Sequence, residues 1–324
     1  MNTFKLASTL ALNNILINHE QALSVVEVDF KSLICEANRI REKYFGDTVS
    51  VCSIINARSG KCSEDCKFCA QSAHNSAVID AFDMLSAEKI VSAFRSASEN
   101  PISHFGIVTS GRDEAGGNEN EKERLIRALK EMGKNVVANL CVSIGGIDDD
   151  FLETLKELGV KRIHHNLETS KKFFPKICST HSFNERVENI KRAKRHGFEV
   201  CSGGLFGIGE NWEDRVDLAL QLQQLEIKSI PLNFLNPVAG TPLENAQPIP
   251  PRDILRIIAL FRFTNPTAEI KVAGGREVNL RDLQSWIFNA GATSIMIGNY
   301  LTTKGRDANQ DLQMIKDLGF RIHR

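Results

Sequence analysis

The chain lacks three features that would direct it to a membrane, to nucleic acid or to the cell exterior. No stretch approaches the roughly 20 consecutive apolar residues that span a bilayer. Neither sign of charge is in excess, because 40 lysines and arginines balance 40 aspartates and glutamates, so we expect no nucleic acid or membrane partner. Eight cysteines in 324 residues do not resemble a secreted disulfide scaffold. We therefore expect a cytoplasmic protein whose reduced thiols bind metal.

The chain also lacks an internal repeat, a low-complexity stretch and a linker that would divide it. Residues 1–46 are predicted to be helical, because apolar residues such as Leu33, Ala37 and Ile40 recur at helical spacing. Cys35 lies on the same stripe, which is typical of a buried small hydrophobe. This part of the chain is interpreted as an N-terminal helical extension.

From residue 48 onward, β-rich runs alternate with helical segments, many of which end at a glycine. Eight such strands predict a single α/β domain, a (β/α)8 TIM-type barrel over residues 47–324, with an open doubly wound sheet as the alternative. The residues after about 300 are expected to form a closing helix. The strand candidates are residues 48–56, 103–110, 135–143, 162–168, 199–207, 228–236, 269–275 and 294–299.

A short cysteine-rich stretch, KCSEDCKFCAQS over residues 61–72, is the strongest signal for chemistry. It places Cys62, Cys66 and Cys69 at C-x3-C-x2-C spacing, with the aromatic Phe68 just before the third thiol. Thiolate ligands at short spacing favour an iron–sulfur cluster or zinc. A structural zinc site normally has a fourth ligand nearby, which the following residues do not supply. Three ligands on a four-iron cluster would leave one iron open to a small molecule.

Other soft or cationic groups are expected near the same mouth, because the active site of a (β/α)8 barrel lies at the carboxyl ends of the strands. The three-cysteine loop directly follows the first strand, on that side. Convergence of these groups beside a cluster motif predicts a second iron–sulfur cluster inside the barrel, whereas Cys52 of the first strand is interpreted as packing. The groups are Cys141 and Cys201 of the third and fifth strands, Cys178 after the fourth, and Arg276 after the seventh.

The cysteine spacing with its aromatic resembles the cluster motif of radical S-adenosylmethionine (SAM) enzymes. From about Phe45 to the end, the chain resembles the biotin synthase family within that superfamily. The segments that carry the resemblance are SGKCSEDCKFCAQS, HHNLETS, FNERVENI, EVCSGGLFGIGE, LNFLNPVAGTPL and IKVAGGRE. CSGG followed later by N-x-L-x-P-x-x-GTPL is more selective than the cysteine motif alone.

The resemblance implies two cofactors and a role for each matching residue. Cys62, Cys66 and Cys69 match the ligands of the [4Fe-4S] cluster that cleaves SAM. Cys141, Cys201 and Arg276 match three ligands of an auxiliary [2Fe-2S] cluster. Phe68, the aromatic of the cysteine motif, is expected beside the first cluster and its SAM. Asn166 and Glu168 match positions that contact the SAM ribose. Arg186 matches an arginine near SAM, and Asn233 matches an asparagine that reaches SAM and the ureido ring.

Two positions depart from the family pattern. The usual second-strand cysteine falls at Gly106, which offers no ligand, and His164 stands where the usual motif begins with Asn. The chain resembles a second branch of the family whose auxiliary cluster contains four irons. We therefore expect Cys141, Cys178 and Cys201 to hold such a cluster, with Arg276 either a ligand or a cation beside it.

The implied activity is that of a sulfurtransferase, the conversion of dethiobiotin to biotin with sulfur from the auxiliary cluster. By analogy with the family, we expect a homodimer and a flavodoxin- or ferredoxin-type electron donor. One alternative is another radical SAM reaction of the same subfamily, such as methylornithine formation or hydrogenase-cofactor maturation. The other is a non-enzymatic metal-binding protein, which would have no reason to carry HHNLETS and LNFLNP.

Overall fold

The computed structural model describes residues 2–323 except 113–117, 135–136, 147 and 304. Eight parallel strands close into a barrel, because β1 pairs with β2 on one side and with β9 on the other. This closure confirms the (β/α)8 prediction and excludes the open sheet. The barrel strands are β1 (Thr48–Arg58), β2 (His104–Thr109), β3 (Asn139–Ser143), β4 (Arg162–His164), β5 (Glu199–Cys201), β7 (Ser229–Phe234), β8 (Glu269–Val272) and β9 (Ser294–Met296).

Two short strands supplement the barrel. The run predicted over 199–207 is interrupted, and its second part, β6 (Gly204–Phe206), pairs with β7. At the C-terminus, β10 (Arg321–Ile322) pairs with the first residues of β1. The first two residues of the strand predicted over 135–143 lie outside the described residues, as does residue 304 of the closing segment.

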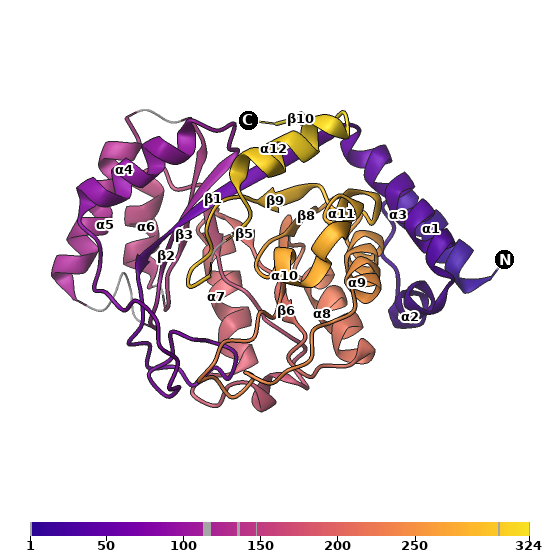
Figure 1. The fold of residues 1–324 in the computed structure, drawn as a ribbon, viewed down its shortest axis with the longest axis horizontal. Helices are drawn as coiled ribbons and strands as arrows, with labels where there is room; N and C mark the ends of the chain where they lie inside the picture. The colour runs from indigo at the N-terminus through magenta and orange to yellow at the C-terminus, as the bar shows by residue number, and fades with distance from the viewer. Residues whose placement is uncertain (1, 113–117, 135–136, 147, 304, 324) are drawn as a thin grey trace.

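Helices cover the outside of the barrel (Figure 1). Several begin at a residue whose side chain accepts a hydrogen bond from the amide three positions on, as Ser86, Asp148 and Ser182 do. The helices that follow β1 are α4 (Ala87–Ser98), α5 (Glu119–Met132), α6 (Asp149–Glu157), α7 (Phe183–Arg195), α8 (Trp212–Gln224), α9 (Pro251–Thr264), α10 (Arg276–Leu280), α11 (Trp286–Asn289) and α12 (Ala308–Asp317). None of the helices in the described ranges has the length and apolar character to cross a bilayer.

The described residues before β1 form three helices, as the apolar spacing predicts: α1 (Thr3–Leu12), α2 (His19–Glu27) and α3 (Phe30–Phe45). They pack along the side of the barrel formed by α8 and α9 (Figure 1). The Phe4 ring lies 5.7 Å from that of Phe263 on α9, so the extension shares the main apolar core. Cys35 of α3 was expected to be buried, but it is exposed because it lies beside the apolar stripe rather than on it.

Strand pleating decides which side chains reach the inside of the barrel. Side chains alternate between faces, so Cys52 and Ile54 of β1 point inward together. In the same way His104 and Gly106 of β2 share the inner face. The carboxyl ends of all eight strands meet at one mouth, where the loops of the site converge.

Candidate metal centre

A cavity of about 470 Å³ occupies the barrel interior and opens at the carboxyl ends of the strands. The thiols of the three-cysteine loop line it, as the sequence predicts. Strand residues from deeper in the barrel line the same cavity, so the loop and the barrel interior form one continuous site. Its lining includes Cys62, Cys66, Phe68, Cys69, Asn166, Glu168, Arg186, Asn233, Cys141 and Cys201.

Hydrogen bonds to its own backbone fix the three-cysteine loop. The Cys62 amide donates to the Gln71 carbonyl at 3.1 Å, which closes the loop on itself. The Asn75 side-chain amide donates to the carbonyls of Cys66 (3.3 Å) and Cys69 (2.8 Å). Gly60 is required before the loop, because its φ is +77° and a Cβ there would meet Ala81 at 2.8 Å.

The spacing of the three thiols fits a cluster better than a single ion. Within the described chain, Cys62, Cys66 and Cys69 do not form a set whose sulfur atoms all lie within 4.8 Å of one another. As these side chains stand, the three sulfurs are too far apart to bind one zinc ion at about 2.3 Å each. A four-iron cluster meets each thiolate through a different iron, so wider spacing suits it. Burial raises the pKa of Cys69 to about 11, so metal binding would have to displace a proton.

Next to the loop, three polar side chains form a connected group that faces the cavity. Arg186 Nη1 donates to the Asn166 carbonyl at 2.9 Å and lies 3.9 Å from the Glu168 carboxylate. The Asn166 side chain accepts from the Gly203 amide at 3.0 Å and donates to Glu168 at 3.4 Å. These three predicted cofactor residues are therefore brought together. A carboxylate, an amide and a guanidinium in one wall can bind the hydroxyl and carboxylate groups of a small ligand.

Glu168 has a positive φ of +68°, which is uncommon for a residue with a side chain. The Gly203 carbonyl holds it there by accepting the amides of Leu167 and Glu168, both at 3.1 Å. A Cβ at Gly203 would lie 1.8 Å from the Pro231 carbonyl oxygen, so only glycine fits at this crossing. The glycines of CSGG thus serve close packing that fixes the Glu168 carboxylate.

Asn233 connects two strand ends at the cavity wall. Its side-chain oxygen accepts from the Gly274 amide at 3.0 Å, and its amide donates to the Gly204 carbonyl at 3.3 Å. Gly275 has a φ of +75°, and a Cβ there would approach the Phe234 carbonyl to 1.8 Å. The VAGG segment therefore turns tightly against β7, which positions Asn233.

A second set of thiols lines the deeper part of the cavity: Cys52, Cys141 and Cys201. Burial raises the pKa of Cys52 and Cys141. Burial also opposes ionisation of Cys201, but Lys271 and then His164 outweigh it and lower the pKa of that thiol to about 6. Three soft ligands beside cationic side chains can hold an anionic cluster.

A buried histidine lies next to this second set. His104 of β2 lines the cavity, and its Nδ1 has no hydrogen-bond partner among the described residues. Burial, followed by the charges of Arg162 and Lys271, lowers the pKa of His104 to about 3, so the ring is neutral at physiological pH. An unpartnered polar atom is costly in a dry interior, so it fits a cavity that receives a bound group.

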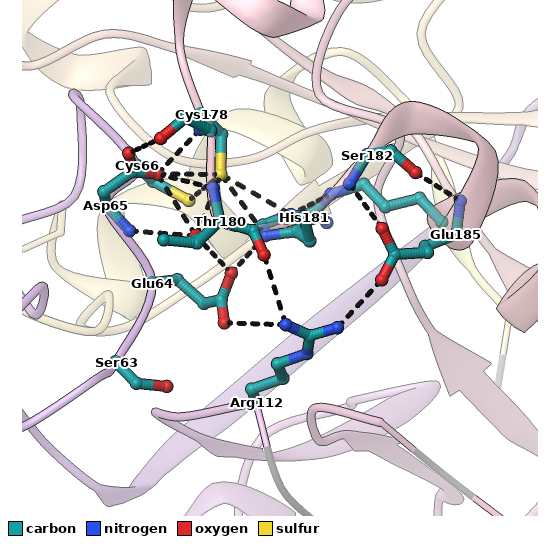
Figure 2. A network of polar contacts seen from close by, with 12 residues as sticks. Ser63, Glu64, Asp65, Cys66, Arg112, Cys178, Thr180, His181, Ser182 and Glu185 are labelled. Carbon is teal, nitrogen blue, oxygen red and sulfur yellow. Dashed lines mark hydrogen bonds and ion pairs between the residues drawn. The ribbon is translucent and has the colours of Figure 1, made fainter.

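The structure does not bring Cys178 together with Cys141 and Cys201. Cys178 does not line the cavity; its sulfur lies 3.7 Å from that of Cys66 and 3.2 Å from His181 Nδ1 (Figure 2). The reason is a contact between distant segments, because Asp65 accepts hydrogen bonds from the two amides that follow Cys178 and ties them to the three-cysteine loop. The hydrogen bond from Cys66 lowers the pKa of Cys178 to about 4.

Arg276 also lies away from the cavity, contrary to the prediction. It opens α10 and is fully buried, with its Nη2 2.5 Å from the Asp311 carboxylate and its Nη1 2.8 Å from Gln284 Oε1. The guanidinium therefore joins α10 to α12. The cation that β8, the seventh barrel strand, presents to the thiols is Lys271, five residues earlier.

Gly106 and His164 both line the cavity. Gly106 is the register partner of Cys141, so the absence of a ligand falls directly beside a thiol of the second set. The sequence contained the signals for the residues that were missed. Period-two alternation places Cys52 inward with Ile54, and the same period places Lys271 inward with Glu269.

Comparison with known proteins agrees with this site. Residues 57–222 match the radical SAM superfamily model, and residues 231–321 match the biotin and thiamin synthesis associated domain. The chain is 51% identical to a biotin synthase of Endomicrobium trichonymphae, over 94% of each chain. It is 47% identical to a biotin synthase of Geotalea uraniireducens, over 98% of this chain and 97% of that one.

A solved structure of methylornithine synthase superposes with a TM-score of 0.84 at 18% identity, covering 98% of this chain and 97% of that one. At that identity the likeness shows the fold alone. The relatives above are similar over nearly their whole length, and the thiols of the matched region line a single cavity. The chain belongs to the biotin synthase family of the radical SAM superfamily.

Proposed function

We propose that the chain converts dethiobiotin to biotin by radical sulfur insertion, with SAM as the source of the radical. The observation that carries this proposal is that one cavity joins the three-cysteine loop to a second set of three thiols. A radical SAM reaction without sulfur transfer does not need a second cluster that donates sulfur. The second set is therefore what favours sulfur insertion over methylornithine formation or hydrogenase-cofactor maturation.

Cys62, Cys66 and Cys69 would hold the [4Fe-4S] cluster, which, when bound with SAM, supplies a 5′-deoxyadenosyl radical. The chain's own task is to orient SAM and exclude water. Glu168, which accepts from the Asn166 side-chain amide, would accept hydrogen bonds from the ribose hydroxyls, and Arg186 beside it would balance a carboxylate. The barrel wall surrounds the cavity except at its mouth, which would limit the contact of a reactive radical with solvent.

Cys52, Cys141 and Cys201 would hold the auxiliary cluster, which supplies the sulfur. This ligand set replaces the predicted one, since Cys178 and Arg276 lie elsewhere. Lys271 and Arg162 are buried beside these thiols, where their positive charges stabilise thiolates. Asn233 lines the same cavity, and by the family resemblance it would hold the ureido ring of dethiobiotin.

A flavodoxin- or ferredoxin-type electron donor, a homodimer and a cytoplasmic location belong to the same proposal. The eight cysteines are unpaired, which suits a reducing compartment. The donor and the dimer rest on the family resemblance.

The test is an anaerobic single turnover of the reconstituted chain with SAM, dethiobiotin and dithionite. We expect biotin and 5′-deoxyadenosine from the parent, and 5′-deoxyadenosine without biotin from Cys141→Ala. The matched control is Cys35→Ala, which changes an exposed thiol on α3 and should behave as the parent does. SAM cleavage by the parent without biotin would refute sulfur insertion.

A further inference from the structure

The second barrel strand lies between two thiols of the proposed auxiliary site. β2 pairs with β1, which carries Cys52, and with β3, which carries Cys141. Neighbouring strands are about 4.8 Å apart, so an inward side chain of β2 lies within reach of a cluster bound by both thiols. A ligand from β2 would close the gap in the site.

Two inward positions of β2 are candidates for that ligand. Gly106, the register partner of Cys141, has no side chain, and a Cβ there would already meet Ile54 at 3.1 Å. His104, the register partner of Cys52, has an imidazole that lines the same cavity. The strand therefore places a nitrogen ligand one pleat away from the position that lacks a ligand.

The state of the His104 ring suits a metal ligand. The residue is 8% exposed, and its Nδ1 has no hydrogen-bond partner in the described part of the chain. Leaving a buried polar atom unpaired costs about 1–3 kcal/mol, so such atoms are rare in folded proteins unless something binds them. Imidazole nitrogen is an established replacement for thiolate on iron–sulfur clusters.

The other nitrogen groups of the cavity floor are less suited. Lys271 and Arg162 carry protonated nitrogens that face Glu269 at 3.3 and 3.4 Å, so they have no free lone pair. The other imidazole in the cavity lining is that of His164. His164 lies on β4, where it is the register partner of Cys201 on β5, and β3 separates it from β2. It therefore provides the natural comparison for a test.

We propose that the His104 imidazole is the fourth protein ligand of the auxiliary cluster, alongside Cys52, Cys141 and Cys201. The inference rests on the proposed function, since it presupposes that a second cluster is bound. It gives the chain a three-thiolate, one-imidazole set in place of the second-strand cysteine that Gly106 cannot supply. A neutral imidazole in place of a thiolate makes the cluster less negative and raises its reduction potential.

The experiment uses the full chain carrying Cys62→Ala, Cys66→Ala and Cys69→Ala, so that the auxiliary cluster is the sole paramagnet after reduction. The chain is reconstituted with iron and sulfide, with natural-abundance or 15N-labelled histidine. Pulsed electron paramagnetic resonance should show a strongly coupled nitrogen whose signal changes on 15N labelling. His104→Gln should abolish that coupling, and His164→Gln should preserve it.

A potential measurement separates ligation from a structural role. His104→Cys restores a thiolate ligand, so it should retain the cluster, lose the nitrogen coupling and lower the reduction potential. A parent cluster without histidine coupling would overturn the inference, as would a coupling that persists in His104→Gln. Absence of any second cluster in the otherwise unmutated chain, with about four irons per chain, would instead refute the proposed function.

Discussion

The buried pair of Arg276 and Asp311 gives the sharpest test of where the structure departs from the prediction. Both side chains have no solvent exposure, and Asp311 also faces Arg306 Nη1 at 3.2 Å. Replacing Asp311 with Asn keeps the shape and removes the charge. Removing one partner of a buried ion pair costs about 3–5 kcal/mol, because the other charge is left without compensation.

The expected size of the effect follows from the length of the chain. An unfolding entropy of about 2.1 cal/mol/K per residue gives about 0.7 kcal/mol/K for 324 residues. A loss of about 3–5 kcal/mol therefore lowers the melting temperature by about 4–7 °C. The assay is thermal unfolding followed by circular dichroism, with iron content measured on the same samples.

Two control variants show whether the loss of stability comes from a buried charge left without its partner. Glu188→Gln on α7 breaks an exposed pair with Lys191 and should cost at most about 1 kcal/mol. Arg276→Met combined with Asp311→Leu should recover much of the loss, because neither charge is then left alone. Arg276 would be a cluster ligand if Asp311→Asn had the melting temperature of the parent while Arg276→Met lost iron. That result would contradict the placement of Arg276 outside the cavity.

Three further predictions concern the thiols and the glycine crossing. Cys178→Ala should retain about eight irons as two clusters, since Cys178 lies outside the cavity; Mössbauer spectra showing only one cluster would contradict this. Cys52→Ser should lose auxiliary iron, whereas Cys35→Ser should not, and equal iron in the two would return Cys52 to a packing role. Gly203→Ala should lower the free energy of unfolding by about 3 kcal/mol, because its Cβ would meet the Pro231 carbonyl at 1.8 Å; urea denaturation matching the parent would refute that crossing.

Strand positions could be predicted because the barrel strands are β-rich runs that alternate with periodic helical segments. Alternation along β1 and β8 also predicts that Cys52 and Lys271 point into the barrel, although Cys52 was interpreted as packing. The sequence therefore contained more of the site than the interpretation used.

The positions of Cys178 and Arg276 could not be read from local pattern. Cys178 lies between β4 and α7 in a segment without periodicity, and its place depends on hydrogen bonds to Asp65, more than a hundred residues away. Arg276 begins a short helix, and its direction is set by Asp311 of the C-terminal helix. Contacts between segments this far apart in the chain determine both side chains.

On the function proposed above, this chain supplies sulfur from a cluster held in its own barrel. The most direct measurement is a single turnover of protein reconstituted with 34S-sulfide, with mass spectrometry of the biotin formed and no other sulfide present. We predict biotin that carries 34S, in an amount limited by the auxiliary cluster. Unlabelled biotin, or 5′-deoxyadenosine without biotin, would contradict the claim.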